Sequence, residues 1–209
     1  MLPPGPERSN WESVLGQPPV AAVPYLLGAL LRTDGVAVRI VEVEAYGGHG
    51  ADAASHAHRG PTDRTAPMFG PPGHIYVYLS YGIHRCVNIV AHVPGASGGV
   101  LLRAAEIVAG EELARLRRGG APAGPQLASG PGRLGQVLGV DLADSGSSLV
   151  SGPVRLPDPP RRMAARLIHS GPRVGISKNR DLPWRFWVAG NPAVSRARPR
   201  GADPDSAAE

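Results

Sequence analysis

The spacing of apolar residues along the chain predicts short elements joined by many turns. Leucines recur at helical spacing between residues 20 and 32, and an Asp-Gly pair follows, so we expect a helix that ends there. Apolar and polar residues alternate on either side of Tyr81-Gly82, which predicts a β-hairpin. Further strands are expected in VLLRAAEI, SSLVSGPVRL, RLIHSGPRVGI and WRFWVAG, and short helices at 111–118 and in SGPGRLGQVLGV.

These elements predict an α+β fold in a single domain covering residues 20–198. Short strands joined by turns favour a curved, mostly antiparallel β-sheet, open and barrel-like, with peripheral helices and a protruding β-hairpin. The proline-rich residues 1–19 are interpreted as a flexible N-terminal arm, and 199–209 as a disordered acidic tail. Residues 47–73 form a long polar loop, and a loop of this length inside a compact domain is usually functional or disordered.

The strand predicted in VRIVEVEAYGG carries two acids. Counting by twos places Glu42 and Glu44 on the side that Val38 and Ile40 mark as buried. Two interpretations follow from this pattern. The strand either runs out into solvent at this end, or it delivers an acid into a pocket.

Composition limits the classes of function. The chain has 209 residues and a formal net charge of +5, which favours an anionic partner such as nucleic acid. Lys178 is the only lysine, so a Schiff-base mechanism has one candidate. Cys86 is the only cysteine, which excludes an internal disulfide and a cysteine-rich metal site. No stretch resembles a signal peptide or a transmembrane helix, so we expect a cytoplasmic protein, nucleoid-associated if the source is bacterial. We also expect a monomer.

Several ordered blocks together resemble the alkyladenine (3-methyladenine) DNA glycosylase family. The blocks are VEVEAYGG, DAASHAHRGPTDR, MFGPPGHIYVYLSYG, RCVNIV, VLLRA, SGPGRLGQVLG and GPRVGISK…PWRFWVAGNPAVS. The resemblance implies a monofunctional enzyme that flips a damaged purine out of duplex DNA, approached from the minor groove, and hydrolyses its N-glycosidic bond with water. It implies no cofactor and no metal. The expected substrates are alkylated or deaminated purines such as 3-methyladenine, 7-alkylguanine, hypoxanthine and ethenoadenine.

The family's catalytic groups correspond to three positions here. Glycosidic hydrolysis passes through an oxocarbenium-like transition state, which a carboxylate can stabilise while orienting water. The resemblance assigns this role to Glu44, the second acid of the block. Arg103 lies in an otherwise apolar strand, where a guanidinium needs a partner, and the resemblance places it beside the acid. The backbone of Val174 matches the family's main-chain ligand of the water. Glu42 is interpreted as a structural acid.

The resemblance also implies a base-binding pocket with aromatic walls, made by Tyr46, His56 and Tyr78. Electron-rich rings stack on any base and attract a cationic alkylated purine. Asn88, a polar residue in an apolar strand, matches the asparagine that crowds the amino group of guanine. It could instead bond only to neighbouring backbone. The neighbouring histidines invite a metal interpretation, which their irregular spacing argues against.

The hairpin turn carries the residues expected to replace the flipped base. Tyr81 matches the family's intercalating tyrosine, and Ile83 stands where relatives often carry methionine. An apolar or aromatic wedge stabilises opened, bent DNA at the cost of unstacking a base step.

Two other functions remain open at this stage. A nucleic-acid-binding module of the same fold would use the basic charge and the Tyr81 wedge without needing Glu44. A carbohydrate glycosidase could pair Glu42 with Glu44, because residues i and i+2 of a strand lie roughly 7 Å apart. That last alternative leaves the basic charge and the wedge unexplained.

Overall fold

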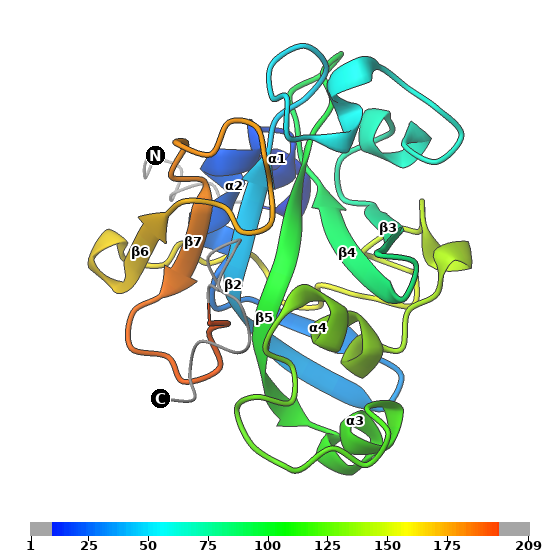
Figure 1. Ribbon diagram of the computed structural model, residues 1–209, viewed down its shortest axis with the longest axis vertical. Helices are drawn as coiled ribbons and strands as arrows, with labels where there is room; N and C mark the ends of the chain where they lie inside the picture. The colour runs from blue at the N-terminus through cyan, green and yellow to red at the C-terminus, as the bar shows by residue number, and fades with distance from the viewer. Residues whose placement is uncertain (1–9, 197–209) are drawn as a thin grey trace, which may run out of the picture.

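Two long strands, β2 (Val36–Tyr46) and β5 (Gly99–Ala109), form the centre of the fold in the computed structural model, which describes residues 10–196 (Figure 1). All pairings in the described sheet are antiparallel, in the order β3-β4-β5-β2-β7-β6, with β1 also paired to β2. The remaining strands are β1 (Leu30–Thr33), β3 (Ile75–Ser80), β4 (His84–Val90), β6 (Ile168–Gly171) and β7 (Arg185–Val188).

Short helices surround this sheet and confirm the predicted α+β class, with an open antiparallel sheet and a β3–β4 hairpin (Figure 1). The α-helices are α1 (Trp11–Leu15), α2 (Pro19–Leu26), α3 (Glu111–Arg117) and α4 (Pro131–Leu138). The 3₁₀ helices are η1 (His56–Arg59), η2 (Ala66–Phe69), η3 (Leu142–Asp144) and η4 (Ala165–Leu167). The long polar loop therefore contains two helical turns, η1 and η2.

A double irregularity between β2 and β5 decides which way the acids point. Ile40 pairs with Ala105 and Glu42 with Ala104, so β2 has one extra residue there; the next pair, Val43 with Leu102, skips Arg103 on β5. Such bulges change the face that later side chains occupy. The buried core accordingly takes its β2 members from the following positions: Val36, Val38, Ile40, Val43 and Ala45.

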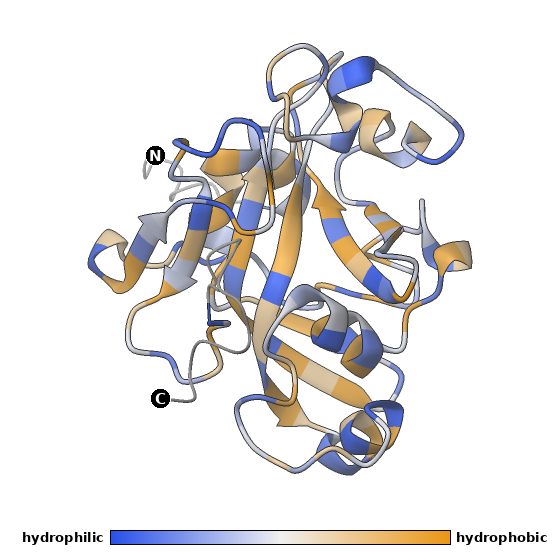
Figure 2. Cartoon of the chain, in the orientation of Figure 1, coloured by the Kyte–Doolittle hydropathy of each residue, from blue (hydrophilic) through white to orange (hydrophobic). Residues whose placement is uncertain are grey.

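The predicted sharing of one face by Ile40, Glu42 and Glu44 is therefore wrong. Period-two counting holds only up to Ile40, and beyond the bulge the odd-numbered residues Val43 and Ala45 pack into the core. Glu42 and Glu44 take the opposite face, where both are fully buried. Figure 2 shows hydrophilic bands that cross the otherwise hydrophobic central strands.

The predicted helix over residues 20–32 is also too long. α2 ends at Leu26, Leu27 is extended, and Gly28 has a φ of 83°, a left-handed conformation that favours glycine. The two leucines that follow belong to strand β1, where Leu31 is fully buried. Apolar spacing alone did not distinguish these two short elements from one helix.

The N-terminal arm predicted for residues 1–19 is not loose in its described part. Asn10 caps α1 by accepting a 2.7 Å hydrogen bond from the Ser13 amide, and Val14 and Leu15 are buried in the core. The domain thus begins no later than Asn10. The predicted tail at 199–209 lies outside the described residues.

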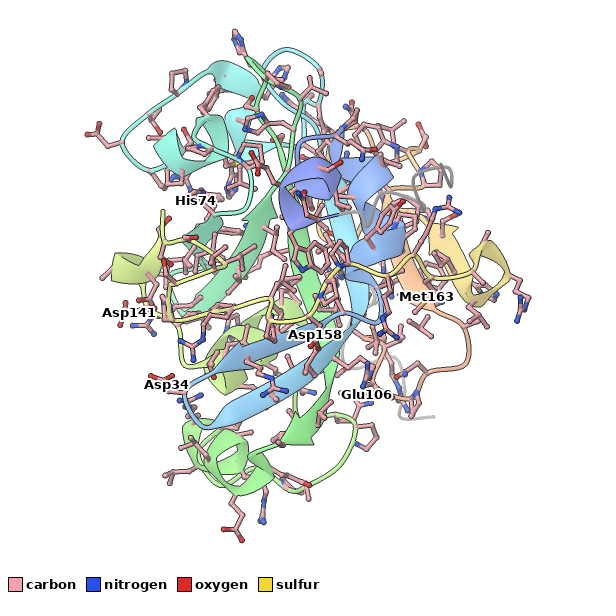
Figure 3. The ribbon with its side chains drawn as sticks, turned by 180° about the vertical axis from the view of Figure 1, so that it is seen from behind. Asp34, His74, Glu106, Asp141, Asp158 and Met163 are labelled. Carbon is pink, nitrogen blue, oxygen red and sulfur yellow. The ribbon has the colours of Figure 1, made fainter. Side chains whose placement is uncertain are left out.

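The segment SSLVSGPVRL is not the strand that its sequence predicted. Its backbone makes only isolated bridges, Arg155 with Arg32 and Ser148 with His74. The chain then crosses behind the sheet, where Figure 3 labels Asp158 and Met163. There the Trp11 indole donates to the Asp158 carbonyl (2.7 Å), which ties α1 to this crossing segment.

Candidate active site

A cavity of about 540 Å³ opens where β2, β3, β4 and β5 meet the long polar loop and the loop between β6 and β7. The latter loop crosses in front of β2 (Figure 1). Of the predicted site residues, all except Glu44 and Ile83 line this cavity: Tyr46, His56, Tyr78, Tyr81, Asn88, Arg103 and Val174. A second cavity, of about 610 Å³ beside Trp11 and Met163, contains none of them.

Glu44 lies directly behind the wall of the first cavity. Its Oε1 accepts a hydrogen bond from the Val174 amide (2.7 Å) and lies 3.1 Å from Nη1 of Arg103. Its Oε2 accepts a hydrogen bond from the Tyr46 hydroxyl (2.8 Å). All three partners line the cavity, so the carboxylate is one contact away from whatever occupies it.

Arg103 bridges the two acids of β2. Its Nε donates to Oε1 of Glu42 (2.8 Å), while Nη1 contacts Glu44. Burial would lower the pKa of Arg103, but the charges of Glu44 and Glu42 raise it overall. The guanidinium in an apolar strand thus has the partners that its burial requires.

Glu42 is enclosed on all sides, away from the cavity. It accepts hydrogen bonds from Nε of Arg185 (2.7 Å) and from the amide (2.6 Å) and hydroxyl (2.9 Å) of Ser195. Burial would raise the pKa of Glu42, but Arg103 and the Ser195 amide hold it below its ordinary value. The pattern fits a structural acid. Sequence reasoning missed Arg185 and Ser195, which lie more than 140 residues away in the chain.

The rings form a continuous wall. The centroids of His56 and Tyr78 lie 4.5 Å apart with the planes at 80°, and Tyr76 stacks on Tyr78 at 5.6 Å. Nδ1 of His56 lies 3.0 Å from the Tyr76 hydroxyl. Tyr76 was missed as a site residue, although the alternation in IYVYLS places it on the same face as Tyr78.

The wall presents neutral rings to the cavity. Burial and the charge of Arg64 lower the pKa of His56, which favours neutral imidazole. Burial and the nearby Glu44 carboxylate raise the pKa of Tyr46, and burial raises that of Tyr78. Both phenols are therefore protonated at neutral pH, and Tyr46 can donate its proton to Glu44.

Asn88 occupies the inner surface of the cavity. Only 4% of it is exposed, and its Nδ2 donates a 3.2 Å hydrogen bond to the Tyr76 carbonyl. It therefore makes the backbone bond of the alternative interpretation and also lines the cavity. That bond fixes the orientation of the amide.

The hairpin turn exposes an aromatic residue at the cavity mouth. Tyr81 is 81% exposed and Ile83 is 68% exposed. Tyr81 and Gly82 have φ values of 51° and 72°, and the Ile83 amide donates to the Ser80 carbonyl (3.2 Å), as in a type I′ turn. A positive φ at tyrosine is uncommon, so the turn holds this ring outward at some cost in strain.

Residues 10–196 contain neither a cluster of potential metal ligands nor a helix that could span a membrane. No group of three or more His, Cys, Asp or Glu side chains there could hold a metal ion, including the histidines of the polar loop. In the same part of the chain, no helix is long and apolar enough to cross a membrane.

Known proteins are similar to this chain over most of its length. A family model described as "Methylpurine-DNA glycosylase" matches residues 13–192. Relatives named "Putative 3-methyladenine DNA glycosylase" include one from Corynebacterium efficiens, 50% identical over 186 residues, 88% of this chain and 95% of that one. Another, from Nocardia farcinica, is 51% identical over 195 residues, 90% of each chain. The resemblance seen in the sequence is confirmed. The chain belongs to the methylpurine-DNA glycosylase family.

Proposed function

We propose that this protein flips alkylated or deaminated purines out of duplex DNA and hydrolyses their N-glycosidic bonds with water, initiating base-excision repair. As a member of a DNA glycosylase family, the chain is a hydrolase of N-glycosyl bonds that acts on DNA. The substrates proposed are 3-methyladenine and 7-alkylguanine, together with hypoxanthine and ethenoadenine. One observation carries the mechanism: the Glu44 carboxylate directly contacts three groups that line a ring-walled cavity.

The chemistry follows from charge. Breaking the bond between base and sugar leaves positive charge on C1′ and the ring oxygen of the deoxyribose. An anionic Glu44, one contact behind the cavity wall, stabilises that charge and accepts a proton from a water that reaches the carboxylate. Arg103 and the Val174 backbone fix the carboxylate and contact the same water, so the nucleophile is aligned before the bond breaks.

The cavity suits a flat base better than a sugar. Its volume is within the usual range for small-ligand sites, and its walls are the rings of Tyr46, His56 and Tyr78. A purine slides between such rings, and a cationic one is attracted to them. Asn88 at the inner surface crowds the exocyclic amino group of guanine, which disfavours the undamaged base.

Tyr81 is proposed to enter the duplex at the step that the purine leaves, with Ile83 packed beside it. The two exposed side chains form the tip of the hairpin, and Tyr81 also lines the cavity mouth. Filling the gap offsets the few kcal/mol lost when the base unstacks. The minor groove is the expected side of approach.

The surroundings of Glu42 argue against the carbohydrate alternative. Paired acids need one carboxyl group free to protonate the leaving group. Glu42 instead contacts Arg103, Arg185 and Ser195, and it does not line the cavity.

Excision by a Glu44→Gln variant tests the proposal. Purified proteins are incubated with duplexes carrying 3-methyladenine, ethenoadenine or hypoxanthine, and abasic sites are scored by alkaline cleavage. We expect the wild-type protein to release the damaged bases. The excision rate of Glu44→Gln should be at least about 100-fold lower, while its binding to lesion DNA is retained. Glu106→Gln, a matched change on β5 outside the cavity, is the control. If Glu44→Gln still excises the bases, Glu44 does not have the catalytic role proposed for it. If the wild-type protein binds lesion DNA but excises nothing, the non-catalytic binding module is favoured.

Water rather than an amine is the proposed nucleophile, although Lys178 lines the same cavity. An amine attacking C1′ would form an imine that borohydride reduces to a stable protein–DNA adduct. We expect borohydride trapping to yield none. An adduct that disappears in Lys178→Gln would refute the water mechanism.

A further inference from the structure

A buried ion pair lies behind one wall of the cavity. Nη2 of Arg173 donates to Oδ1 of Asp52 (2.9 Å), and Nη1 of Arg173 contacts the other carboxylate oxygen. Both side chains are fully buried. The pair joins the polar loop after β2 to the loop between β6 and β7, and neither residue was singled out from the sequence.

The guanidinium of this pair stacks on Tyr46. Its central carbon lies 4.6 Å from the centroid of the Tyr46 ring and 5.4 Å from that of Trp184. Arg173 does not line the cavity, whereas Tyr46 does. The guanidinium therefore covers one face of a ring that also lines the space in which the purine is proposed to bind.

A carboxylate balances that cation closely. Asp52 also accepts hydrogen bonds from the amides of Gly47 (3.0 Å) and Ala54 (3.1 Å) and from the Asn179 side chain (3.1 Å). Burial would raise the pKa of Asp52, but Arg173 and the amides of Ala54 and Gly47 lower it overall, so the carboxyl group is ionised at neutral pH. The pair as a whole carries no net charge.

We propose that Asp52 determines the preference for cationic purines, by neutralising the guanidinium of Arg173 behind the Tyr46 ring. A ring face attracts cations through its electron-rich π system. Without a neighbouring carboxylate, a guanidinium on the opposite face of the ring would weaken this attraction. It would also repel a cationic base, because the protein interior screens charge only weakly. With Asp52 in place, the ring keeps its attraction for 3-methyladenine and 7-methylguanine. This inference rests on the proposed function.

The consequence is a change in selectivity rather than in overall activity. Asp52→Asn keeps the shape of the side chain and removes its charge. Excision of cationic 7-methylguanine then falls by about 30-fold relative to excision of neutral hypoxanthine, the size of one cation–π interaction inside a desolvated site. A purely structural role for Asp52 would slow both reactions to the same extent.

The experiment measures single-turnover excision rates from two duplexes that differ only in the damaged base, 7-methylguanine or hypoxanthine. The ratio of the two rates is compared in wild type, in Asp52→Asn and in the double variant Asp52→Asn with Arg173→Gln. The double variant restores neutrality behind the ring, so its ratio returns to that of wild type. Circular dichroism confirms that each variant is folded.

The outcomes separate this inference from the proposed function. A wild-type protein that releases neither of these bases, nor 3-methyladenine or ethenoadenine, overturns both. A wild-type protein that releases both bases, with an unchanged ratio in folded Asp52→Asn, overturns the inference alone. If Asp52→Asn is unfolded, the single variant Arg173→Gln decides: removing the cation raises the ratio, and a ratio that stays constant or falls overturns the inference.

Discussion

Replacing Glu42 with glutamine is expected to destabilise the fold although the shape of the side chain hardly changes. The carboxylate is fully buried and accepts bonds from two guanidiniums and from Ser195. Removing one partner of a buried ion pair costs about 3–5 kcal/mol, because a charge is left without compensation. Arg103 keeps Glu44 as a partner, so only Arg185 is left without a carboxylate.

The expected loss is therefore at the low end of that range, about 3 kcal/mol. Arg185 retains its bond to the Ser195 carbonyl (2.9 Å) and its position 4.8 Å from the Trp187 ring, which partly compensate the lost charge. For a chain of this size, each kcal/mol lowers the melting temperature by about 2–4 °C, so we expect a decrease of about 6–12 °C.

The pH dependence of the stability difference provides a second check of this prediction. The pKa of Glu42 in the folded protein lies below its ordinary value of 4.5. Its contribution to the free energy of unfolding is therefore fully present above pH 4.5 and is lost as the pH falls through the lower, folded value. The stability difference between wild type and Glu42→Gln should shrink over that range.

Thermal and urea unfolding, followed by circular dichroism at pH 7.5 and at pH values below 4.5, measure both effects. Glu106→Gln serves as the matched control, since Glu106 is only partly buried and accepts one bond, from Asn191 (2.6 Å). We expect it to melt within a few degrees of wild type, as most changes at partly exposed positions do. Equal stability of Glu42→Gln and wild type at pH 7.5, or a difference that widens in acid, would refute the reasoning.

Two further predictions concern the hairpin and its contact with α4. Tyr81→Ser should lower excision from duplex DNA while leaving excision from single strands nearly unchanged, because only a duplex has a gap to fill; equal loss on both substrates in a rate comparison would contradict the wedge. Gly135→Ala should destabilise the protein by about 1–3 kcal/mol, because an added Cβ would lie 1.9 Å from the Arg85 carbonyl oxygen. Urea unfolding measures this, with the exposed Arg133→Ala on the same helix as control, and an unchanged midpoint would contradict it.

Strands whose alternation is undisturbed could be read from the sequence. The β3–β4 hairpin and its turn at Tyr81-Gly82 are where the pattern predicts them, because each residue pair is local and the turn glycine marks the reversal. The position of β5 was also predicted, although its irregularity at Arg103 was not. Helix α4 follows from Leu134, Val137 and Leu138 at helical spacing, all of which are buried.

The features that could not be predicted from the sequence depend on residues far apart in the chain. A bulge needs only one extra residue, and Val41 carries no mark that distinguishes it from the paired residues around it. The partners of Glu42 and the pairing of Asp52 with Arg173 join segments more than 100 residues apart. Val14 and Leu15 are buried only because they join a core that distant segments of the chain build.

The two bulges give two acids of one strand different surroundings. Without the extra residue on β2, Glu42 and Glu44 would face the apolar core instead of Arg103. With it, both project toward Arg103, which β5 turns to the same face by its own irregularity. Ser195 and Arg185 then close around Glu42, while Glu44 meets Tyr46 and Val174 at the cavity. The guanidinium of Arg103 thus contacts both the structural acid and the proposed catalytic acid. A change at Glu42 should therefore also disturb the groups that hold Glu44.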